Sequence, residues 1–157
     1  MFDLSGKRAL ITGSVAGLGK AMAIALARQG ATVILNGRSD EHLDNTQREF
    51  SELGLDAHKV CFDIGDLEAA VSRVNKINQE IGTIDILINN VGYRDRKSVQ
   101  EFAIGDMDKM LSKNLSAPFE LSRLLAPAMM SKGWGRIINV SSVVATIASD
   151  GDATYVA

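Results

Sequence analysis

The sequence predicts an α/β fold, in which a parallel sheet carries helices on both faces. Short apolar runs rich in β-branched residues recur along the chain, separated by longer stretches with helical spacing. The near-continuous hydrophobicity of the short runs suits strands covered on both faces, and parallel strands need the helices between them as crossovers. Most of the 14 glycines fall at the junctions between these segments, where turns require them.

Five strands are expected, at 8–12, 31–36, 57–62, 84–89 and 135–141. Helices are expected at 17–29, 40–53 and 66–81, followed by a long helical region from Ile104 to about 132. Pro118 lies in this last region and suits the first turn of a helix, so a new helical segment is expected near it. No linker or repeat interrupts the alternation, and residues 1–157 are expected to form a single domain.

Composition excludes several classes of function. The net charge of −2 comes from 17 basic and 19 acidic residues that are spread along the chain, so no basic stripe for nucleic acid is expected. Cys61 is the single cysteine and is expected in the core, which indicates a reducing compartment. His42 and His58 have no partners at metal-ligand spacing, so no metal site is expected.

The sequence also predicts a cytoplasmic protein without a membrane segment. The N-terminus, MFDLSGKRALI, lacks the charged start and long apolar run of a signal peptide. No window approaches the roughly 20 apolar residues that a membrane helix requires.

The junction after the first strand has the features of a phosphate-binding turn. In LITGSVAGLGKAMAIALA the strand runs into Thr12 and Gly13, and Gly17 and Gly19 follow at the start of a helix. Such a turn exposes backbone N–H groups at a helix N-terminus, which bind a phosphate or pyrophosphate. The spacing is T-G-x-x-x-G-x-G, which differs from a Walker loop and from G-x-G-x-x-G. A purely structural tight turn is the alternative.

The end of the second strand indicates which dinucleotide would bind. A carboxylate there bonds the ribose 2′-OH of NAD, whereas an arginine suits the 2′-phosphate of NADP. The sequence has Asn36, Gly37 and Arg38 and no acid before Asp40, which favours NADP over NAD. An ordinary solvated turn is the alternative, since Asn-Gly is a strong turn dipeptide. After the third strand, Asp63 is expected either to bond an adenine edge or to cap the next helix.

Several motifs taken in order resemble the short-chain dehydrogenase/reductase family. They are TGSVAGLG at 12–19, NNVG at 89–92, Asn114 in SKNLS, NVSS at 139–142, and Tyr155. Ser142 precedes Tyr155 by 13 residues, a separation typical of the family's catalytic pair. The resemblance covers the whole chain and implies a dinucleotide-binding domain with a Rossmann-type doubly wound sheet.

The resemblance also implies a role for each matching residue. The pyrophosphate would lie on the first turn, formed by Thr12, Gly13, Ser14, Gly17, Leu18 and Gly19. Arg38 would meet the 2′-phosphate, and Asp63 with the backbone near Asn90 and Gly92 would hold the adenosine half. Ser142 would polarise a substrate carbonyl, Tyr155 would transfer the proton, and Asn114 would order a water relay. Two hydroxyl donors suit the negative charge that develops on the carbonyl oxygen during hydride transfer.

Members of the family place a lysine four positions after the tyrosine, beyond Ala157. A phenol without a neighbouring cation keeps a pKa of about 10, so the 157 residues alone are expected to have little or no dehydrogenase activity. The domain is therefore expected to be truncated, with the sheet incomplete at its C-terminal side and the strand at 135–141 left as a bare edge.

The expected activity is the NADP(H)-dependent interconversion of a ketone and a secondary alcohol. The opening residues, the NGR turn and NNVGYRDR look most like the gluconate 5-dehydrogenase branch, and 3-oxoacyl-carrier-protein reductases are the nearest rival. Arg94, Arg96 and Lys97 would favour an anionic substrate such as a sugar acid, with a solvated charged loop as the alternative. A non-catalytic NADP-binding fragment is the other class of function.

The long helical region predicts a homodimer or homotetramer for the complete protein. Relatives pair through this region, where six apolar residues suggest a wide apolar surface. They are Phe119, Leu121, Leu124, Leu125, Met129 and Met130. Burial of all six against the sheet is the alternative.

Overall fold

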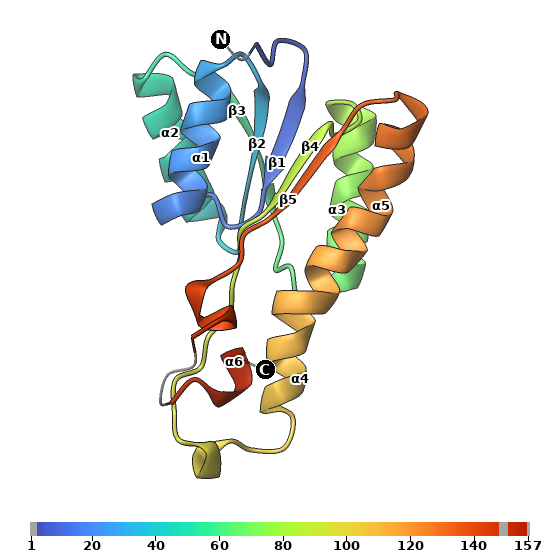
Figure 1. The fold of residues 1–157 in the computed structure, drawn as a ribbon. Helices are drawn as coiled ribbons and strands as arrows, with labels where there is room; N and C mark the ends of the chain where they lie inside the picture. The colour runs from blue at the N-terminus through green and yellow to red at the C-terminus, as the bar shows by residue number, and fades with distance from the viewer. Residues whose placement is uncertain (1–2, 148–150, 157) are drawn as a thin grey trace.

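A computed structural model describes residues 3–147 and 151–156 and shows a parallel five-stranded sheet (Figure 1). The strands are β1 (Arg8–Ile11), β2 (Thr32–Gly37), β3 (Ala57–Cys61), β4 (Ile86–Asn89) and β5 (Arg136–Asn139). Their spatial order is β3-β2-β1-β4-β5, and each neighbouring pair is parallel. The predicted doubly wound α/β fold is confirmed, although β4 and β5 are each shorter than predicted.

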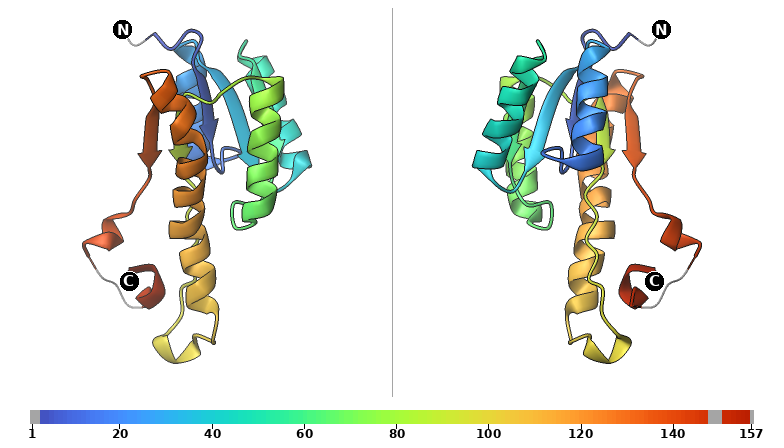
Figure 2. Two further views of the ribbon diagram at one scale, coloured as in Figure 1. Left: turned by 90° about the vertical axis from the view of Figure 1, so that its right-hand side faces the viewer. Right: turned by 90° about the vertical axis from the view of Figure 1, so that its left-hand side faces the viewer.

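Helices cover both faces of the sheet (Figures 1 and 2). On one face lie α1 (Gly17–Arg28) and α2 (Asp40–Glu52), and on the other lie α3 (Leu67–Glu80) and α5 (Ala117–Ser131). Side chains of β1 alternate between the two layers: Leu10 packs in the cluster of α3 and α5, whereas Ala9 and Ile11 pack in that of α1 and α2. This alternation explains why the strands are apolar at consecutive positions.

Side-chain caps determine where two of the helices begin. Ser39 caps α2 by accepting a hydrogen bond from the His42 N–H, and Asp66 caps α3 by accepting one from the Ala69 N–H at 3.0 Å. The capping role considered for Asp63 is therefore wrong, because Asp66 occupies that position. Asp63 instead accepts from the N–H of Gly65 at 2.9 Å, within the turn that precedes the cap.

The long helical region predicted after Ile104 is made of three segments. A short helix, α4 (Asp106–Leu111), continues through a π-helical turn, Ser112–Ser116, into α5. Pro118 lies in the first turn of α5, as predicted, where its missing N–H costs no helical hydrogen bond. Figure 1 shows α4 and α5 following one another along a single long axis that extends beyond the sheet.

Short segments complete the described chain. They are two 3₁₀ turns, Val99–Glu101 and Val143–Ala145, and a single helical turn, α6 (Ala153–Val156). Both 3₁₀ turns and α6 lie on the same side of the molecule as α4, below the carboxyl edge of the sheet in Figure 1.

Asp85 connects β4 to the elements on either side of it. Its Oδ2 accepts from the Arg8 N–H at 3.0 Å, and its Oδ1 contacts Lys132 Nζ at 2.6 Å. Burial alone would raise the pKa of the Asp85 carboxyl, but the hydrogen bonds from Lys132 and the Arg8 N–H outweigh it, so this pKa lies below its usual value. The side chain thus joins β1, β4 and the end of α5 where the strands begin.

β5 forms an exposed edge of the described sheet. All four of its residues are exposed, including Ile137 at 37% and Ile138 at 47%. An edge strand with apolar side chains and unpaired backbone groups favours pairing with another chain. The bare edge predicted at 135–141 is therefore present in the structure.

The six apolar residues of the long helical region divide between the core and the surface. Leu121, Leu125 and Met129 are buried against the sheet, whereas Phe119 is 62% and Met130 79% exposed. The predicted wide apolar surface is therefore wrong for the three buried leucine and methionine side chains, because the i, i+4, i+8 positions of α5 face the sheet.

In the part of the chain that the structure describes, no helix is long and apolar enough to cross a membrane. The same residues hold no group of three or more His, Cys, Asp or Glu side chains placed to bind a metal ion.

Candidate active site

The candidate site lies where β1 and β4 pair side by side at the centre of the sheet. The chain runs from β1 to β2 on one side, while β4 lies on the other side, so the strand order reverses between β1 and β4. In open α/β sheets ligands bind beyond the carboxyl ends of the strands at this reversal. The glycine-rich turn follows β1 and NNVG follows β4, so the fold brings these two predicted motifs together.

The glycine-rich turn has a backbone that larger residues would distort. Gly17 adopts a φ of +54°, which L side chains rarely adopt. A Cβ at Gly19 would lie 2.6 Å from Asn90 Nδ2 and even closer to the carbonyl oxygen of Gly13. Gly17 and Gly19 open α1, and the first N–H groups of a helix have no carbonyl partner within it. This arrangement fits a pyrophosphate, with Leu18, 59% exposed, on the outer side of the turn.

Thr12 and Asn90 hold the glycine-rich turn against the segment that follows β4. Thr12 Oγ1 accepts from the N–H groups of Asn90 and Val91 at 2.9 and 3.2 Å. Asn90 Nδ2 donates to the carbonyl oxygens of Thr12 and Gly13 at 3.0 and 3.3 Å. Thr12 is 1% exposed, so its side chain supports the turn from the inside of the protein.

Asn36 is a buried structural member of the site, in the strand where it was predicted. It is 1% exposed and lies in β2, so the solvated NGR turn is not what the structure contains. Its Oδ1 accepts from the Gly13 N–H at 3.2 Å, and its Nδ2 donates to the carbonyl oxygens of Val60 and Phe62 at 3.3 and 3.1 Å. Ser14 is fully buried, and its Oγ accepts from the Asn36 N–H at 2.9 Å and donates to the Asn36 carbonyl oxygen at 3.5 Å.

Arg38 lies at the rim of a cavity of about 380 Å³ that the glycine-rich turn and the NNVG segment line together. Its side chain is 74% exposed and reaches Asp63 Oδ2 at 3.9 Å, while Lys113 Nζ approaches the same oxygen at 3.7 Å. Asp63, Gly92 and Asn90 also line this cavity. An exposed arginine with one long ion pair is available to an anionic group, so these residues fit an adenosine 2′-phosphate better than a bare ribose hydroxyl.

A second cavity, of about 610 Å³, brings the three predicted catalytic residues together. Asn114, Ser142 and Tyr155 all line it, although Asn114 lies in the π-helical turn, Ser142 caps the 3₁₀ turn after β5, and Tyr155 lies in α6. Val91 and Gly92 line both cavities, so the two spaces meet there. A Cβ at Gly92 would lie 3.9 Å from the Tyr155 hydroxyl, which places the tyrosine beside the predicted cofactor segment.

Both polar atoms of the Asn114 side-chain amide form hydrogen bonds with the backbone of Tyr93. Its Oδ1 accepts from the Tyr93 N–H at 2.7 Å, and its Nδ2 donates to the Tyr93 carbonyl oxygen at 2.8 Å. The residue lies in the π-helical turn, and such turns inside helices occur frequently at functional sites. The helical pattern expected from Ile104 to about 132 does not reveal this interruption.

Ser142 and Tyr155 lie in short turns at the mouth of the cavity. Ser142 Oγ accepts from the Val144 N–H at 3.4 Å, so its own proton remains available to a substrate oxygen. Tyr155 lies in α6, whose first turn is closed by the Tyr155 N–H donating to the Asp152 carbonyl oxygen at 2.9 Å. A cation lies beside this tyrosine, since the Arg94 guanidinium is 5.5 Å from the ring centroid.

The three cations that follow NNVG are paired with carboxylates. Arg94 and Arg96 contact Asp152, and Lys97 contacts Asp95 at 2.8 Å and Asp106 at 2.7 Å. The hydrogen bond with Asp152 raises the pKa of Arg94. The hydrogen bonds that Lys97 donates to Asp106 and to Asp95 raise the pKa of Lys97, and the bond that Asp106 accepts from Lys97 lowers the pKa of Asp106.

A wider depression, of about 940 Å³, opens at the amino ends of the strands, opposite the candidate site. Thr32, Ala57 and His58 line it, at the amino ends of β2 and β3. None of the predicted site residues lines it, and in parallel sheets the chemistry lies at the other edge. Its size therefore reflects an open groove between α2 and the neighbouring turns.

The fold is that of a Rossmann-type dinucleotide-binding domain, and comparison with known proteins agrees with it. Residues 7–157 match the family model described as short chain dehydrogenase. The chain belongs to the short-chain dehydrogenase family.

Individual relatives cover the whole of this chain. It is 43% identical over 157 residues to a gluconate 5-dehydrogenase from Gluconobacter oxydans and spans 61% of that protein. It is 35% identical over 155 residues to a 3-oxoacyl-[acyl-carrier-protein] reductase from Escherichia coli, of which it spans 62%. The crystal structure of a gluconate 5-dehydrogenase from Burkholderia cenocepacia, in complex with NADP and tartrate, superposes with a TM-score of 0.89 at 34% identity, covering 98% of this chain and 60% of that one.

Proposed function

We propose that this chain provides the cofactor site and most of the catalytic site of an NADP(H)-dependent oxidoreductase that interconverts a ketone and a secondary alcohol. The observation that carries the proposal is the junction of two cavities at Gly92, one lined by Arg38 and the other by Ser142 and Tyr155. A hydride donor and a carbonyl must meet at such a junction for reduction to occur.

In this proposal the side chains act on the oxygen and the proton of the substrate. When bound, the cofactor supplies or accepts the hydride. Ser142 donates a hydrogen bond to the carbonyl oxygen as negative charge develops on it, and Tyr155 delivers the proton. Asn114 fixes the Tyr93 backbone and so the wall of the cavity beside Gly92. The family's lysine position lies beyond Ala157.

Two observations support NADP over NAD. Arg38 is the exposed side chain at the end of β2, and the first carboxylate after it is Asp40, which opens α2. The Burkholderia relative was crystallised with NADP. The preference can be measured on the chain as it is, because the residues proposed to hold the cofactor lie within it.

The cofactor experiment compares NADPH with NADH by calorimetric titration. A charge-assisted hydrogen bond contributes about 1.5–3 kcal/mol, so NADPH is expected to bind roughly 10- to 100-fold more tightly than NADH. Arg38→Ala should remove most of this difference. Arg73→Ala, an exposed arginine of α3, serves as a matched control and should preserve it. Equal affinities for the two cofactors in the unmodified chain would refute the assignment of Arg38.

We propose a sugar acid such as gluconate as the substrate. The 43% identity with the Gluconobacter enzyme supports this choice. The loop cations do not add support, because Arg94, Arg96 and Lys97 each have a carboxylate partner. A 3-oxoacyl-carrier-protein reductase activity is the second candidate, on the strength of 35% identity with the Escherichia coli enzyme.

The activity experiment follows NADPH absorbance with a panel of keto-acids, ketones and 3-oxoacyl thioesters. A form continued through the family's lysine is expected to reduce a carbonyl, with Tyr155→Phe abolishing the activity, whereas the 157 residues alone should show little turnover. Cofactor binding without turnover in both forms would favour the non-catalytic NADP-binding class.

A homodimer or homotetramer is proposed for the complete protein. Exposed apolar side chains along the π-helical turn and α5, among them Leu115 at 63% and Phe119 at 62%, support a contact between subunits. Light scattering that shows only monomer at micromolar concentration would contradict it.

A further inference from the structure

Asp152 is a fully buried carboxylate that lies three residues before Tyr155 and outside the motifs of the predicted site. Its side chain is 0% exposed. Arg94 Nε donates to Asp152 Oδ1 at 2.6 Å, Arg94 Nη2 contacts Oδ2, and Arg96 Nη2 lies 3.3 Å from Oδ2. An unpaired buried carboxylate is strongly unfavourable, so the guanidinium groups stabilise Asp152 in this position.

Backbone contacts reinforce the connection between the two segments. The Lys97 N–H donates to the Gly151 carbonyl oxygen at 3.0 Å. The Asp152 carbonyl oxygen accepts from the N–H groups of Tyr155 and Val156 at 2.9 and 3.0 Å. The Arg94 guanidinium, 5.5 Å from the Tyr155 ring centroid, is within cation–π range. An ion pair, a backbone hydrogen bond and a ring contact therefore join residues 94–97 to the turn that carries Tyr155.

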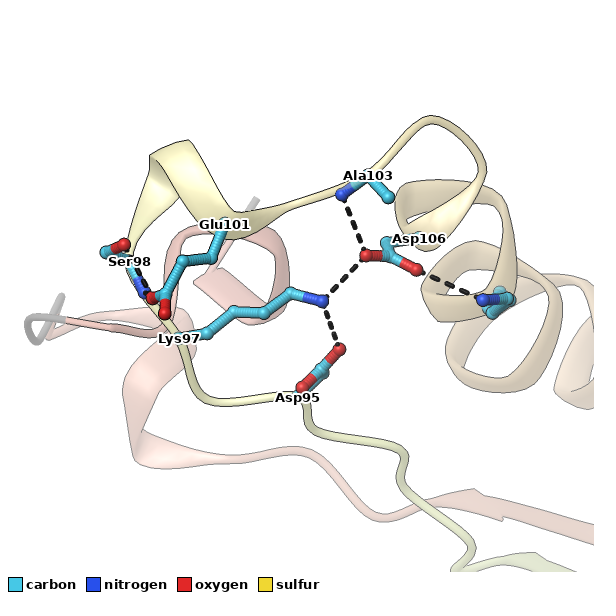
Figure 3. A network of polar contacts seen from close by, with 7 residues as sticks. Asp95, Lys97, Ser98, Glu101, Ala103 and Asp106 are labelled. Carbon is cyan, nitrogen blue, oxygen red and sulfur yellow. Dashed lines mark hydrogen bonds and ion pairs between the residues drawn. The ribbon is translucent and has the colours of Figure 1, made fainter.

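Residues 95–106 are themselves fixed to α4 by a network of polar contacts, which Figure 3 shows. Lys97 Nζ bridges Asp95 and Asp106, and Asp106 also accepts from the Ala103 N–H at 3.0 Å. Glu101 accepts from the Ser98 N–H at 2.8 Å and closes the turn between them. The segment that holds Asp152 is thus anchored to a helix, not left as a solvated loop.

The turn that carries Tyr155 depends on such external support. α6 has four residues, and a single helical turn fixes more backbone freedom than its hydrogen bonds repay. The guanidinium partners of Asp152, Arg94 and Arg96, lie in the segment after β4 and not in the sheet. The contacts of Asp152 instead place α6 beside the cavity that Ser142 and Asn114 line.

We propose that Asp152 is a positioning residue for Tyr155 and that Arg94 holds Asp152 in this role. The inference rests on the proposed function in that Tyr155 is taken as the proton donor. In this proposal Arg94 binds the carboxylate of Asp152 and not the carboxylate of a substrate. Arg96 is an auxiliary partner, because its side chain is 63% exposed and makes the longer contact.

Hydrogen exchange measured by mass spectrometry on the 157-residue chain tests the positioning without any need for activity. In the unmodified chain the amides of Tyr155 and Val156 should be protected. Asp152→Asn and Arg94→Gln should each speed exchange in the 151–156 segment by roughly tenfold or more, whereas amides of β1 and β4 stay protected. The double variant should exchange no faster than Asp152→Asn alone, because the two residues act as one unit.

Two further variants make the result specific. Arg96→Gln, which removes the weaker partner of the same carboxylate, should change exchange by less than about threefold. Arg94→Lys keeps the charge but loses the two-point contact, and should give an intermediate rate. Unchanged exchange in Asp152→Asn, or loss of protection throughout the sheet in both single variants, would overturn the proposal.

The activity assay separates positioning from substrate binding. In a form continued through the family's lysine, Arg94→Gln should lower kcat by a similar factor for a keto-acid and a neutral ketone, with KM little changed. A loss confined to the keto-acid and seen in KM would assign Arg94 to the substrate and overturn the inference. The proposed function fails independently if Tyr155→Phe leaves turnover unchanged, whatever the exchange data show.

Discussion

Asn36→Asp tests the buried amide that joins the glycine-rich turn to the sheet. The substitution preserves shape and keeps the oxygen that accepts from the Gly13 N–H at 3.2 Å. In the unmodified protein Asn36 Nδ2 donates to the carbonyl oxygens of Val60 and Phe62 at 3.3 and 3.1 Å. The substitution puts an oxygen in place of this donor, facing the same two carbonyl oxygens. The change therefore isolates two hydrogen bonds at a side chain that is 1% exposed.

The expected loss in the free energy of unfolding follows from the two carbonyl groups that lose their hydrogen-bond donor. Each buried carbonyl left unpaired costs about 1–3 kcal/mol, and two of them, together with a buried charge, predict a loss of about 3 kcal/mol or more in the free energy of unfolding at pH 7. Burial and the facing carbonyls should raise the folded-state pKa of the introduced carboxyl above its unfolded value of about 3.9. Below about pH 4 the protonated carboxyl has one O–H and serves one of the two carbonyls, so the deficit falls to that of one unpaired carbonyl, about 1–3 kcal/mol. Because the folded state binds the proton more tightly, the deficit grows as the pH rises through the folded pKa.

Urea unfolding monitored through the fluorescence of Trp134, the single tryptophan, measures the effect at pH 4 and pH 7. Asn75→Asp introduces the same charge at an exposed position of α3 and serves as the control. A deficit at pH 7 below about 1 kcal/mol, or one that matches the control, would refute the reasoning.

Three other outcomes are expected. Gly19→Ala should weaken NADPH binding and lower stability by about 1–3 kcal/mol, because the new methyl group would meet Asn90 Nδ2 at 2.6 Å, and unchanged binding in the titration would contradict it. Asp85→Asn should lose the charge-assisted bond to Lys132 and lower the free energy of unfolding at pH 7 by about 1–2 kcal/mol. Since the folded pKa of Asp85 is lowered, this contribution is present above the unfolded pKa of about 3.9 and disappears as the pH falls through the folded value, so the two proteins should converge in acid. Ile138→Lys, at the exposed edge of β5, should reduce self-association in light scattering, and an unchanged mass would argue against pairing through this edge.

The sequence by itself determined the layered α/β architecture and the position of the cofactor turn. Apolar runs such as ATVILN can be recognised because a strand covered on both faces must be apolar at consecutive positions. Gly17 can be recognised because its positive φ disfavours side chains there, whatever the rest of the fold. These are local requirements, so local patterns reveal them.

Only the tertiary structure decided which polar residues are buried and what they hold. Asn36 occurs in a typical turn dipeptide, yet its partners are Gly13, Val60 and Phe62, from two other segments of the chain. Asp152 lies 58 positions along the chain from Arg94, and no local pattern marks the pair. Hydrogen bonds and ion pairs of this kind depend on which segments the sheet and helices bring together, and the burial that makes them strong exists only after the chain has folded.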